Sequence, residues 1–282
     1  MKTYKTIHEV RAFSESEQNK GKTVGFVPTM GALHKGHLDL IRASKEKCDI
    51  TLASIFVNPT QFNKAEDLEK YPRDVHRDIK LLEDAGCNAV FTPSVNEVYK
   101  HGSDVKIELG NITNELEGKF RPGHFNGVAL VVSKLFNIVK PNVAFFGQKD
   151  IQQFYVIKKL RDALNFPINL EMVPTKREAN GLAMSSRNER LEIADRDHAS
   201  LIYKSLQKAK KELQDGQDLA EVKERLAELF SNSNGLTLEY FEAVNSEDFK
   251  PLSRITKGEN IVLCLAAEID NVRLIDNIPL FS

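Results

Sequence analysis

Short runs of apolar residues alternate with longer amphipathic segments along the first 175 residues of the chain. The runs have the length and composition of buried strands, and they fall at residues 24–27, 50–57, 89–91, 142–146 and 169–173. Between them, apolar residues recur every three or four positions, which predicts helices over residues 6–18, 37–47, 67–85, 125–139 and 150–164. Strands that alternate with helices in this way predict a parallel sheet with right-handed crossovers.

Two segments depart from this alternation. Residues 106–118 are less regular, and their pattern favours an edge strand followed by a short helix. After residue 175 the chain has two charged amphipathic helices and then strands. The predicted elements are helices over residues 198–215 and 219–231, a turn at SNSNG (231–235), a strand over 238–244, and a hairpin of 260–269 with 271–276 around Asp270-Asn271.

This change of pattern places a domain boundary between residues 175 and 176. The sequence therefore predicts an α/β protein. Residues 1–175 are expected to form a Rossmann-like parallel sheet with helices on both faces, and residues 176–282 a smaller α+β C-terminal domain.

The composition limits the class of protein. A charged share of 28% and a hydrophobic share of 41% are ordinary for a globular chain, and 39 Lys and Arg balance 40 Asp and Glu, which argues against a nucleic-acid partner. Cys48, Cys87 and Cys264 are few and far apart, so we expect a reducing compartment without disulfides. No apolar run reaches membrane-spanning length, and residues 1–13 lack a secretion-signal core. A cytoplasmic protein with no membrane partner is expected.

Residues 24–37 (VGFVPTMGALHKGH) contain the most informative connection. A strand pattern ends at Pro28, and a helix pattern opens near Gly36. A helix N-terminus attracts phosphate through its unpaired N–H groups and its dipole, and glycine lets a ligand approach the backbone. The imidazoles of His34 and His37 can donate hydrogen bonds to phosphate oxygens. The sequence therefore predicts a nucleotide site here, with His37 closest to the chemistry.

Other interpretations of these histidines stay open. H-x-x-H is also a metal-pair spacing, but Gly36 weakens the helix between the two residues and no third His or Cys lies nearby, so zinc is less favoured. An ordinary surface or core histidine is the remaining alternative for His34 and for His37.

Polar residues also follow the next predicted strands, and carboxyl ends of parallel strands meet at one sheet edge. Asn58 and Gln61 follow the strand at residues 50–57 and suit a substrate hydroxyl or carboxylate, although Asn-Pro is also a common turn. Arg121 precedes the helix at 125–139. An anionic ligand and solvent are equally good partners for it on this local pattern.

Two further loops carry cationic residues. In GQKDIQQ, Asp150 and Gln153 fit a helix capping box, whereas Lys149 needs another explanation and suits the phosphates of a nucleotide. In GLAMSSRNE, Ser186 and Glu189 fit a capping box as well.

That second box leaves Ser185 and Arg187 unexplained. Two hydroxyls and a guanidinium on a loop that contains Gly181 resemble a mobile clamp for a polyphosphate, because arginine grips phosphate oxygens bidentately.

These motifs resemble known families. H-x-G-H and MSSRN are similar to the HIGH and KMSKS signatures of nucleotidylyltransferases and class I aminoacyl-tRNA synthetases. The longer strings PTMGALHKGH, FVNPTQF, YPRD, RPGHFNGV, FGQKDIQQ and GLAMSSRN together resemble the pantothenate synthetase (pantoate–β-alanine ligase) family. The resemblance implies ATP-dependent condensation of (R)-pantoate with β-alanine through a pantoyl-adenylate, with release of AMP and pyrophosphate.

The resemblance also implies roles for residues. His37 would be the catalytic acid, and His34 and Lys149 would be the other catalytic residues. The implied ATP site consists of Met30, Gly31, Ala32, Leu33, His34, Lys35, Gly36, His37, Gly147, Gln148, Lys149, Asp150, Lys176, Met184, Ser185, Ser186 and Arg187. Gln61 and Gln153 would hold pantoate, with Gln61 also beside β-alanine, and Asn58, Tyr71 and Arg121 would line the same crevice. Gln148 departs from the family pattern, where relatives often have glutamate.

Cofactors and partners follow from the same resemblance. Mg²⁺ would bridge the ATP phosphates with mainly phosphate and water ligands, because no carboxylate cluster marks a protein-built site, and Asp78 stays unassigned. A homodimer is implied, and residues 176–282 would act as a lid. The alternatives are a nucleotidylyltransferase that acts on a phosphorylated metabolite and a non-catalytic nucleotide- or RNA-binding module, against which the balanced charge counts.

Overall fold

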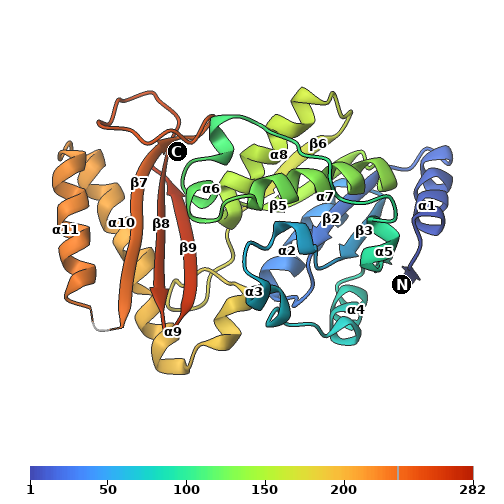
Figure 1. Cartoon of the computed structure of the whole chain (residues 1–282), viewed down its shortest axis with the longest axis horizontal. Helices are drawn as coiled ribbons and strands as arrows, with labels where there is room; N and C mark the ends of the chain where they lie inside the picture. The colour runs from blue at the N-terminus through green and yellow to red at the C-terminus, as the bar shows by residue number, and fades with distance from the viewer. Residues whose placement is uncertain (234, 282) are drawn as a thin grey trace. The chain divides into compact units, whose positions relative to one another are not determined.

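The computed structural model describes residues 1–233 and 235–281. It divides into two compact units, one of Met1–Gly147 with Val156–Pro174 and one of Gln148–Tyr155 with Thr175–Ser282, and each is described by itself. Figure 1 labels most of the helices and strands of both. Among the described residues, no helix is long and apolar enough to cross a membrane.

The first unit is built on a six-stranded sheet in which every neighbouring pair of strands is parallel, in the order β1-β4-β3-β2-β5-β6. The strands are β1 (Lys2–Tyr4), β2 (Val24–Thr29), β3 (Ile50–Ile55), β4 (Ala89–Phe91), β5 (Val143–Gly147) and β6 (Asn169–Val173). The predicted parallel sheet is confirmed. The sequence pattern missed β1, because three residues at a sheet edge carry no readable alternation.

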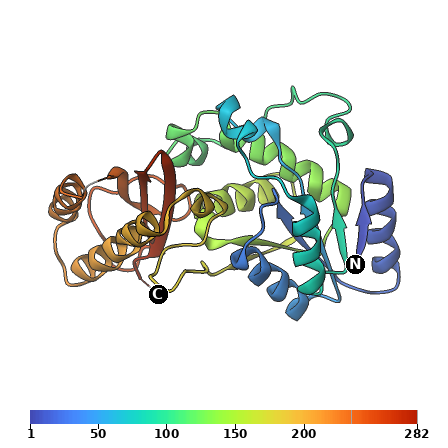
Figure 2. The same cartoon turned by 90° about the horizontal axis from the view of Figure 1, so that it is seen from below.

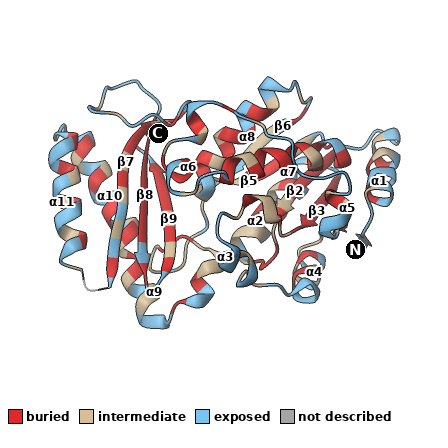
Figure 3. Cartoon of the chain, in the orientation of Figure 1, coloured by how far each residue is buried: buried red, intermediate tan, exposed pale blue. Residues whose placement is uncertain are grey.

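Helices cover both faces of this sheet (Figure 2). The covering helices are α1 (Ile7–Asn19), α2 (Lys35–Lys47), α4 (Val75–Asp84) and α7 (His124–Val139). Helices α1 and α7 contact each other and β2, whereas α2 contacts β2, β3, β5 and α4. Apolar side chains fill the layer beneath α2, among them Leu33, Ile41, Leu82 and Phe145, and the inner strands β2, β3, β4 and β5 are largely buried (Figure 3).

The carboxyl end of β2 is where the strand order reverses. Strands β3 and β4 continue on one side of β2, and β5 and β6 continue on the other. β2 pairs with β3 as far as Thr29, but the described pairing with β5 stops at Phe26. Pro28 has no N–H to donate, and it lies beyond this last pair. Ligands of open α/β sheets bind at such a point, so the segment after β2 is where a site is expected.

The second unit contains a three-stranded antiparallel sheet, in the order β7-β8-β9. Its strands are β7 (Leu236–Asn245), β8 (Ile261–Ile269) and β9 (Val272–Pro279), and its helices are α9 (Ile193–Ala199), α10 (Leu201–Gln214) and α11 (Leu219–Ser231). Helix α10 packs on β8 and β9, and α11 packs on β7. The predicted hairpin is confirmed, with Asp270 and Asn271 both at positive φ. Residue 234 of the predicted SNSNG turn lies outside the described residues.

Two predicted elements are wrong. The helix expected over residues 67–85 is broken into α3 (Ala65–Glu69) and α4, because Pro72 removes a backbone donor and restricts the residue before it. Residues 106–118 were expected to form an edge strand followed by a short helix, and the described chain has no strand there, although short helices are present. The N–H of Ile107 donates to the Asn126 side chain, and the short helices η2 (Asn111–Thr113) and α6 (Glu117–Phe120) follow.

The remaining short elements complete the chain. They are η1 (Pro59–Gln61), α5 (Val95–Val98), η3 (Gln148–Asp150), α8 (Ile151–Ala163) and η4 (Ser186–Arg190). The helix expected over residues 198–215 is α10, with α9 as a separate helix before it.

Candidate functional site

His34 and His37 lie at the first turn of α2, directly after β2. The Gly36 N–H donates to Nδ1 of His34 at 3.1 Å, and the His34 N–H donates to Nδ1 of His37 at 3.2 Å. A neutral imidazole that accepts at Nδ1 carries its proton on Nε2. The rings are 4.0 Å apart between centroids. The first turn of α2 therefore combines two Nε2–H donors with a helix N-terminus, an arrangement suited to phosphate oxygens.

The turn that leads into α2 is held by Asp78, a buried residue of α4. Its two carboxylate oxygens accept the N–H groups of Ala32 at 2.9 Å and of Leu33 at 2.8 Å. Burial raises the pKa of the Asp78 carboxyl, and the two backbone donors oppose that shift. The sequence left Asp78 unassigned. The available signal was an acidic residue four positions before Leu82, on the face of α4 that is buried.

Gln61 ends η1 and is held by Asn58, the N-cap of that turn. The Asn58 Nδ2 donates to the Gln61 side-chain oxygen at 3.1 Å and to the Gly127 carbonyl at 3.2 Å, while the Tyr99 hydroxyl donates to Asn58 Oδ1 at 2.6 Å. Because its oxygen accepts from Asn58, the Gln61 amide presents its NH₂ group elsewhere, and this group lies 2.9 Å from the sulfur of Met30. Asn58 thus fixes which way the Gln61 amide points.

Helix α7 supports the same turn through its backbone. A Cβ at Gly127 would lie 2.2 Å from the Thr60 carbonyl oxygen, so only glycine permits this approach. Nδ1 of the buried His124 lies 2.9 Å from the Gln61 carbonyl oxygen, and its Nε2 lies 3.1 Å from Arg121. Arg121 is therefore tied to the residues that support Gln61. The supporting role of His124 was not predicted from the sequence.

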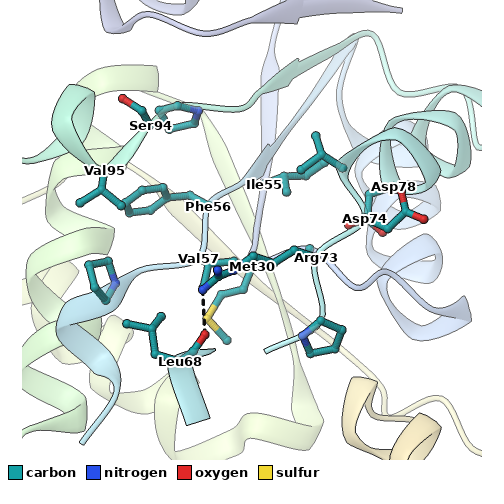
Figure 4. Close-up of a pocket in the computed structure, with 15 residues that line it drawn as sticks. Met30, Ile55, Phe56, Val57, Leu68, Arg73, Asp74, Asp78, Ser94 and Val95 are labelled. Carbon is teal, nitrogen blue, oxygen red and sulfur yellow. Dashed lines mark hydrogen bonds between the residues drawn. The ribbon is translucent and has the colours of Figure 1, made fainter. Parts of the chain in front are cut away.

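A pocket of about 340 Å³ is lined in part by Met30 (Figure 4). Apolar side chains such as Ile55 and Val57 line it, with Asp78 at one end. Arg73 donates to the carbonyl of Leu68 at 2.7 Å, the bond drawn as a dashed line. Tyr71 belongs to the same segment, and its ring packs edge-on against Phe62 with centroids 5.7 Å apart.

In the second unit, Lys149 belongs to the turn η3 that follows β5. Its ammonium is 3.8 Å from the Asp150 carboxylate, and 16% of its side chain is exposed. Gly147 is the last residue of β5, and Gln153 lies half-buried in the first turn of α8. The carbonyls of Gln148 and Lys149 both accept from the Asn277 side chain.

Residues 176–184 form a small hairpin in this unit. The Met184 N–H donates to the Lys176 carbonyl at 2.9 Å, which places these two predicted nucleotide residues side by side. The prediction that Ser186 caps the next turn is wrong. Ser185 is the cap of η4, and its hydroxyl accepts the Arg187 N–H at 3.2 Å.

The half-buried Arg187 side chain follows that cap. It has no ion pair or hydrogen bond within the described chain, so its guanidinium is available to an anionic ligand.

Comparison with known proteins identifies the family. Residues 2–279 match the family model described as pantoate-beta-alanine ligase. The chain belongs to the pantoate-beta-alanine ligase family. The motif-based resemblance is confirmed.

Individual relatives agree over their whole length. A pantothenate synthetase of Acinetobacter baylyi is 47% identical over 279 residues, which are 99% of this chain and 98% of the relative. The crystal structure of pantothenate synthetase from Thermus thermophilus superimposes with a TM-score of 0.91 at 39% identity and full coverage of both chains. The pantoate-beta-alanine ligase of Francisella tularensis, solved with "Beta-gamma ATP and Beta-alanine", gives a TM-score of 0.82 at 36% identity, and the match covers 100% of this chain and 98% of that one.

For this pantoate-beta-alanine ligase family member, the position of Asp78 leads to a first prediction. Asp78→Asn replaces one acceptor oxygen with an NH₂ group that faces a backbone N–H, so one of the two bonds to the turn is lost. We expect kcat/KM for ATP to fall about tenfold because the turn before His34 is less well held. Asp84→Asn, on an exposed position of the same helix, is the matched control. Equal activity of both variants would contradict the positioning role.

A second prediction concerns Asn58. Asn58→Asp keeps the shape but places a carboxylate oxygen against the Gln61 oxygen, so the Gln61 amide must turn. We expect the KM for the acid substrate to rise about tenfold while the KM for ATP changes little. Tyr99→Phe, the control, removes a bond on the far side of Asn58 and should cost about 1 kcal/mol of stability with the KM for the acid nearly unchanged. If Tyr99→Phe raises that KM equally, the orientation of Gln61 is not the cause.

Proposed function

We propose that the chain is an ATP-dependent ligase that condenses (R)-pantoate with β-alanine through a pantoyl-adenylate and releases AMP and pyrophosphate. The observation that carries the proposal is the family match over residues 2–279, which includes every motif singled out in the sequence. The "Beta-gamma ATP and Beta-alanine" bound to the Francisella relative support the same substrates.

The first step joins the acid to AMP. A carboxylate oxygen of pantoate attacks the α-phosphorus of ATP, the bond from that phosphorus to the bridging oxygen breaks, and pyrophosphate leaves with the bonding pair. Negative charge grows on the phosphate oxygens as this happens. Nε2–H of His37, the Lys149 ammonium and the Arg187 guanidinium are the groups of this chain suited to stabilise that charge.

The second step forms the amide. The amine nitrogen of β-alanine attacks the acyl carbon of the adenylate, the bond from that carbon to the AMP oxygen breaks, and the nitrogen loses a proton. Gln61 and Gln153 are proposed to hold pantoate through both steps. The oriented NH₂ of Gln61 is the donor that a pantoate oxygen requires.

Mg²⁺ is proposed to enter with the phosphates of ATP. In the described residues no group of three or more His, Cys, Asp or Glu side chains is placed to hold a metal, and both oxygens of Asp78 accept backbone donors. Apart from Asp150, whose carboxylate pairs with Lys149, the proposed nucleotide side chains are neutral or cationic, which fits phosphate oxygens. Such an ion would neutralise phosphate charge, and its ligands would be mainly phosphate and water.

Three further proposals rest on the resemblance. Residues 176–282 act as a lid that excludes water from the adenylate, since adenylates hydrolyse readily. The chain assembles as a homodimer, which light scattering of the purified protein checks. It works in the cytoplasm, in keeping with Cys48, Cys87 and Cys264, all three of which are free thiols.

Product analysis tests the proposed function. Purified protein with ATP, pantoate and β-alanine should form pantothenate, AMP and pyrophosphate in equal amounts, and without β-alanine it should exchange labelled pyrophosphate into ATP only when pantoate is present. A nucleotidylyltransferase, the less favoured alternative, would form a stable dinucleotide from a phosphorylated acceptor and no amide. That outcome would overturn the proposal.

A further inference from the structure

Strand β9 carries two adjacent buried polar residues, Asp276 and Asn277, which the proposed chemistry does not use directly. Only 3% of Asp276 and 2% of Asn277 is exposed. Burying a carboxylate and an amide is costly unless both are hydrogen-bonded. Their partners are therefore informative, and they lie in two different loops of the second unit.

Asn277 holds the turn that contains Lys149. Its Nδ2 donates to the carbonyl of Gln148 at 3.0 Å and to the carbonyl of Lys149 at 2.8 Å. Two acceptors on one side require the NH₂ group there, which defines the orientation of the amide. The backbone from which the Lys149 ammonium extends is thereby tied to β9.

Asp276 holds the hairpin of residues 176–184. Its oxygens accept from both terminal nitrogens of Arg177, at 2.5 and 3.0 Å, in a bidentate pair. Arg177 also donates to the Gly181 carbonyl at 3.1 Å, and its guanidinium stacks 3.6 Å from the centroid of the Tyr203 ring. Burial raises the pKa of the Asp276 carboxyl, and the Arg177 guanidinium opposes that shift.

The position of Arg177 sets the rest of the hairpin. Arg177 pairs with Ala183 as an antiparallel bridge, directly before Met184. Gly181 turns the chain at φ +96°, where a Cβ would lie 2.8 Å from Tyr203. The segment 184–187 therefore starts from a backbone that Asp276 fixes through Arg177.

We propose that Asp276 and Asn277 are positioning residues that hold two nucleotide-binding loops, 148–150 and 176–187, on one rigid strand. Because both loops are fixed before ATP binds, Lys149 and Arg187 are already in position to contact its triphosphate. This inference rests on the proposed function, because it assigns both loops to ATP. Donors that are fixed in advance stabilise a transition state better than mobile ones, and sheet residues are a more precise support than loops.

Two substitutions test the proposal, one for each loop. Arg177→Lys keeps the charge but loses the fork that grips Asp276, and Asn277→Ala removes both bonds to the turn 148–149. The matched control is Arg273→Lys, because Arg273 also lies on β9 and pairs with Glu239 of β7 instead of a loop. Melting temperatures are measured first, and Arg177→Lys remains as the test if Asn277→Ala does not fold.

The readouts are affinity for α,β-methylene ATP by calorimetry, pantoate-dependent pyrophosphate exchange, and the KM for β-alanine. We expect each loop variant to bind the analogue about tenfold more weakly and to exchange more slowly, with the KM for β-alanine within about twofold of native. The control should match the native chain in all three. A residue needed only for folding would not separate ATP binding from β-alanine use in this way.

Two results would overturn the inference: native affinity for the analogue in both loop variants, or an equal loss in Arg273→Lys. If the native chain binds ATP but makes no pantothenate, the proposed function fails while the affinity comparison still decides the role of β9. If the native chain does not bind ATP, both are refuted.

Discussion

Replacing His37 with alanine is expected to lower the rate of adenylate formation by about 10²-fold or more, because a donor to the phosphate oxygens is lost as charge develops on them. Pantoate-dependent pyrophosphate exchange measures this step without the amine. His8→Ala, on an exposed position of α1, is the control and should exchange at the native rate.

His37 also accepts the His34 N–H, so the alanine variant alone does not separate catalysis from the start of α2. His37→Asn separates them, since its amide oxygen lies near the place of Nδ1 and it has no group in the place of Nε2. We expect this variant to melt like the native protein and to be as inactive as His37→Ala. If His37→Asn exchanges at the native rate, His37 serves only to begin the helix.

Replacing Lys149 with methionine is expected to have a comparably large effect. The change keeps the unbranched length and removes the ammonium, so stabilisation of the departing pyrophosphate is lost while the apolar stem still packs. Loss of one such donor lowers kcat by about 10²- to 10³-fold. Single-turnover release of pyrophosphate from ATP and pantoate measures the loss.

The control for Lys149 is Lys159→Met, which removes an exposed ammonium from α8. It should retain native turnover and native melting. A fall in turnover equal to that of Lys149→Met would show that the effect comes from net charge. A rise in the KM for ATP at unchanged kcat would assign Lys149 to ground-state binding.

The layered sheet was predictable because its signal is local and repeated. Every residue of β3 is buried, which is why residues 50–57 read as a continuous apolar run. The failures have identifiable causes. Pro72 interrupts the helix although the apolar spacing continues on both sides of it. The Ile107 N–H donates to a side chain of α7, where a neighbouring strand was expected as its partner.

The site was predictable to the extent that its residues are neighbours in the chain. His34 and His37 interact across a single helical turn, so their spacing is visible in the sequence. Asp78 acts on backbone groups about 45 residues away, and Asn277 acts on carbonyls 128 and 129 residues away. Such partners contact main-chain atoms, which every residue has, so no motif records them.

The support of Gln61 also limits how the enzyme can be redesigned. Its side chain is hydrogen-bonded to Asn58, and its carbonyl oxygen is hydrogen-bonded to His124. The backbone of Thr60, directly before it, packs closely against Gly127, which has no side chain. With Gln61 in its proposed role of holding the acid, we therefore expect that larger acids will not be accommodated by a shift of this glutamine. Library design for new acyl donors should leave residues 58–61 and 124–127 unchanged and randomise side chains such as Met30, whose unbranched thioether adapts to the volume beside it.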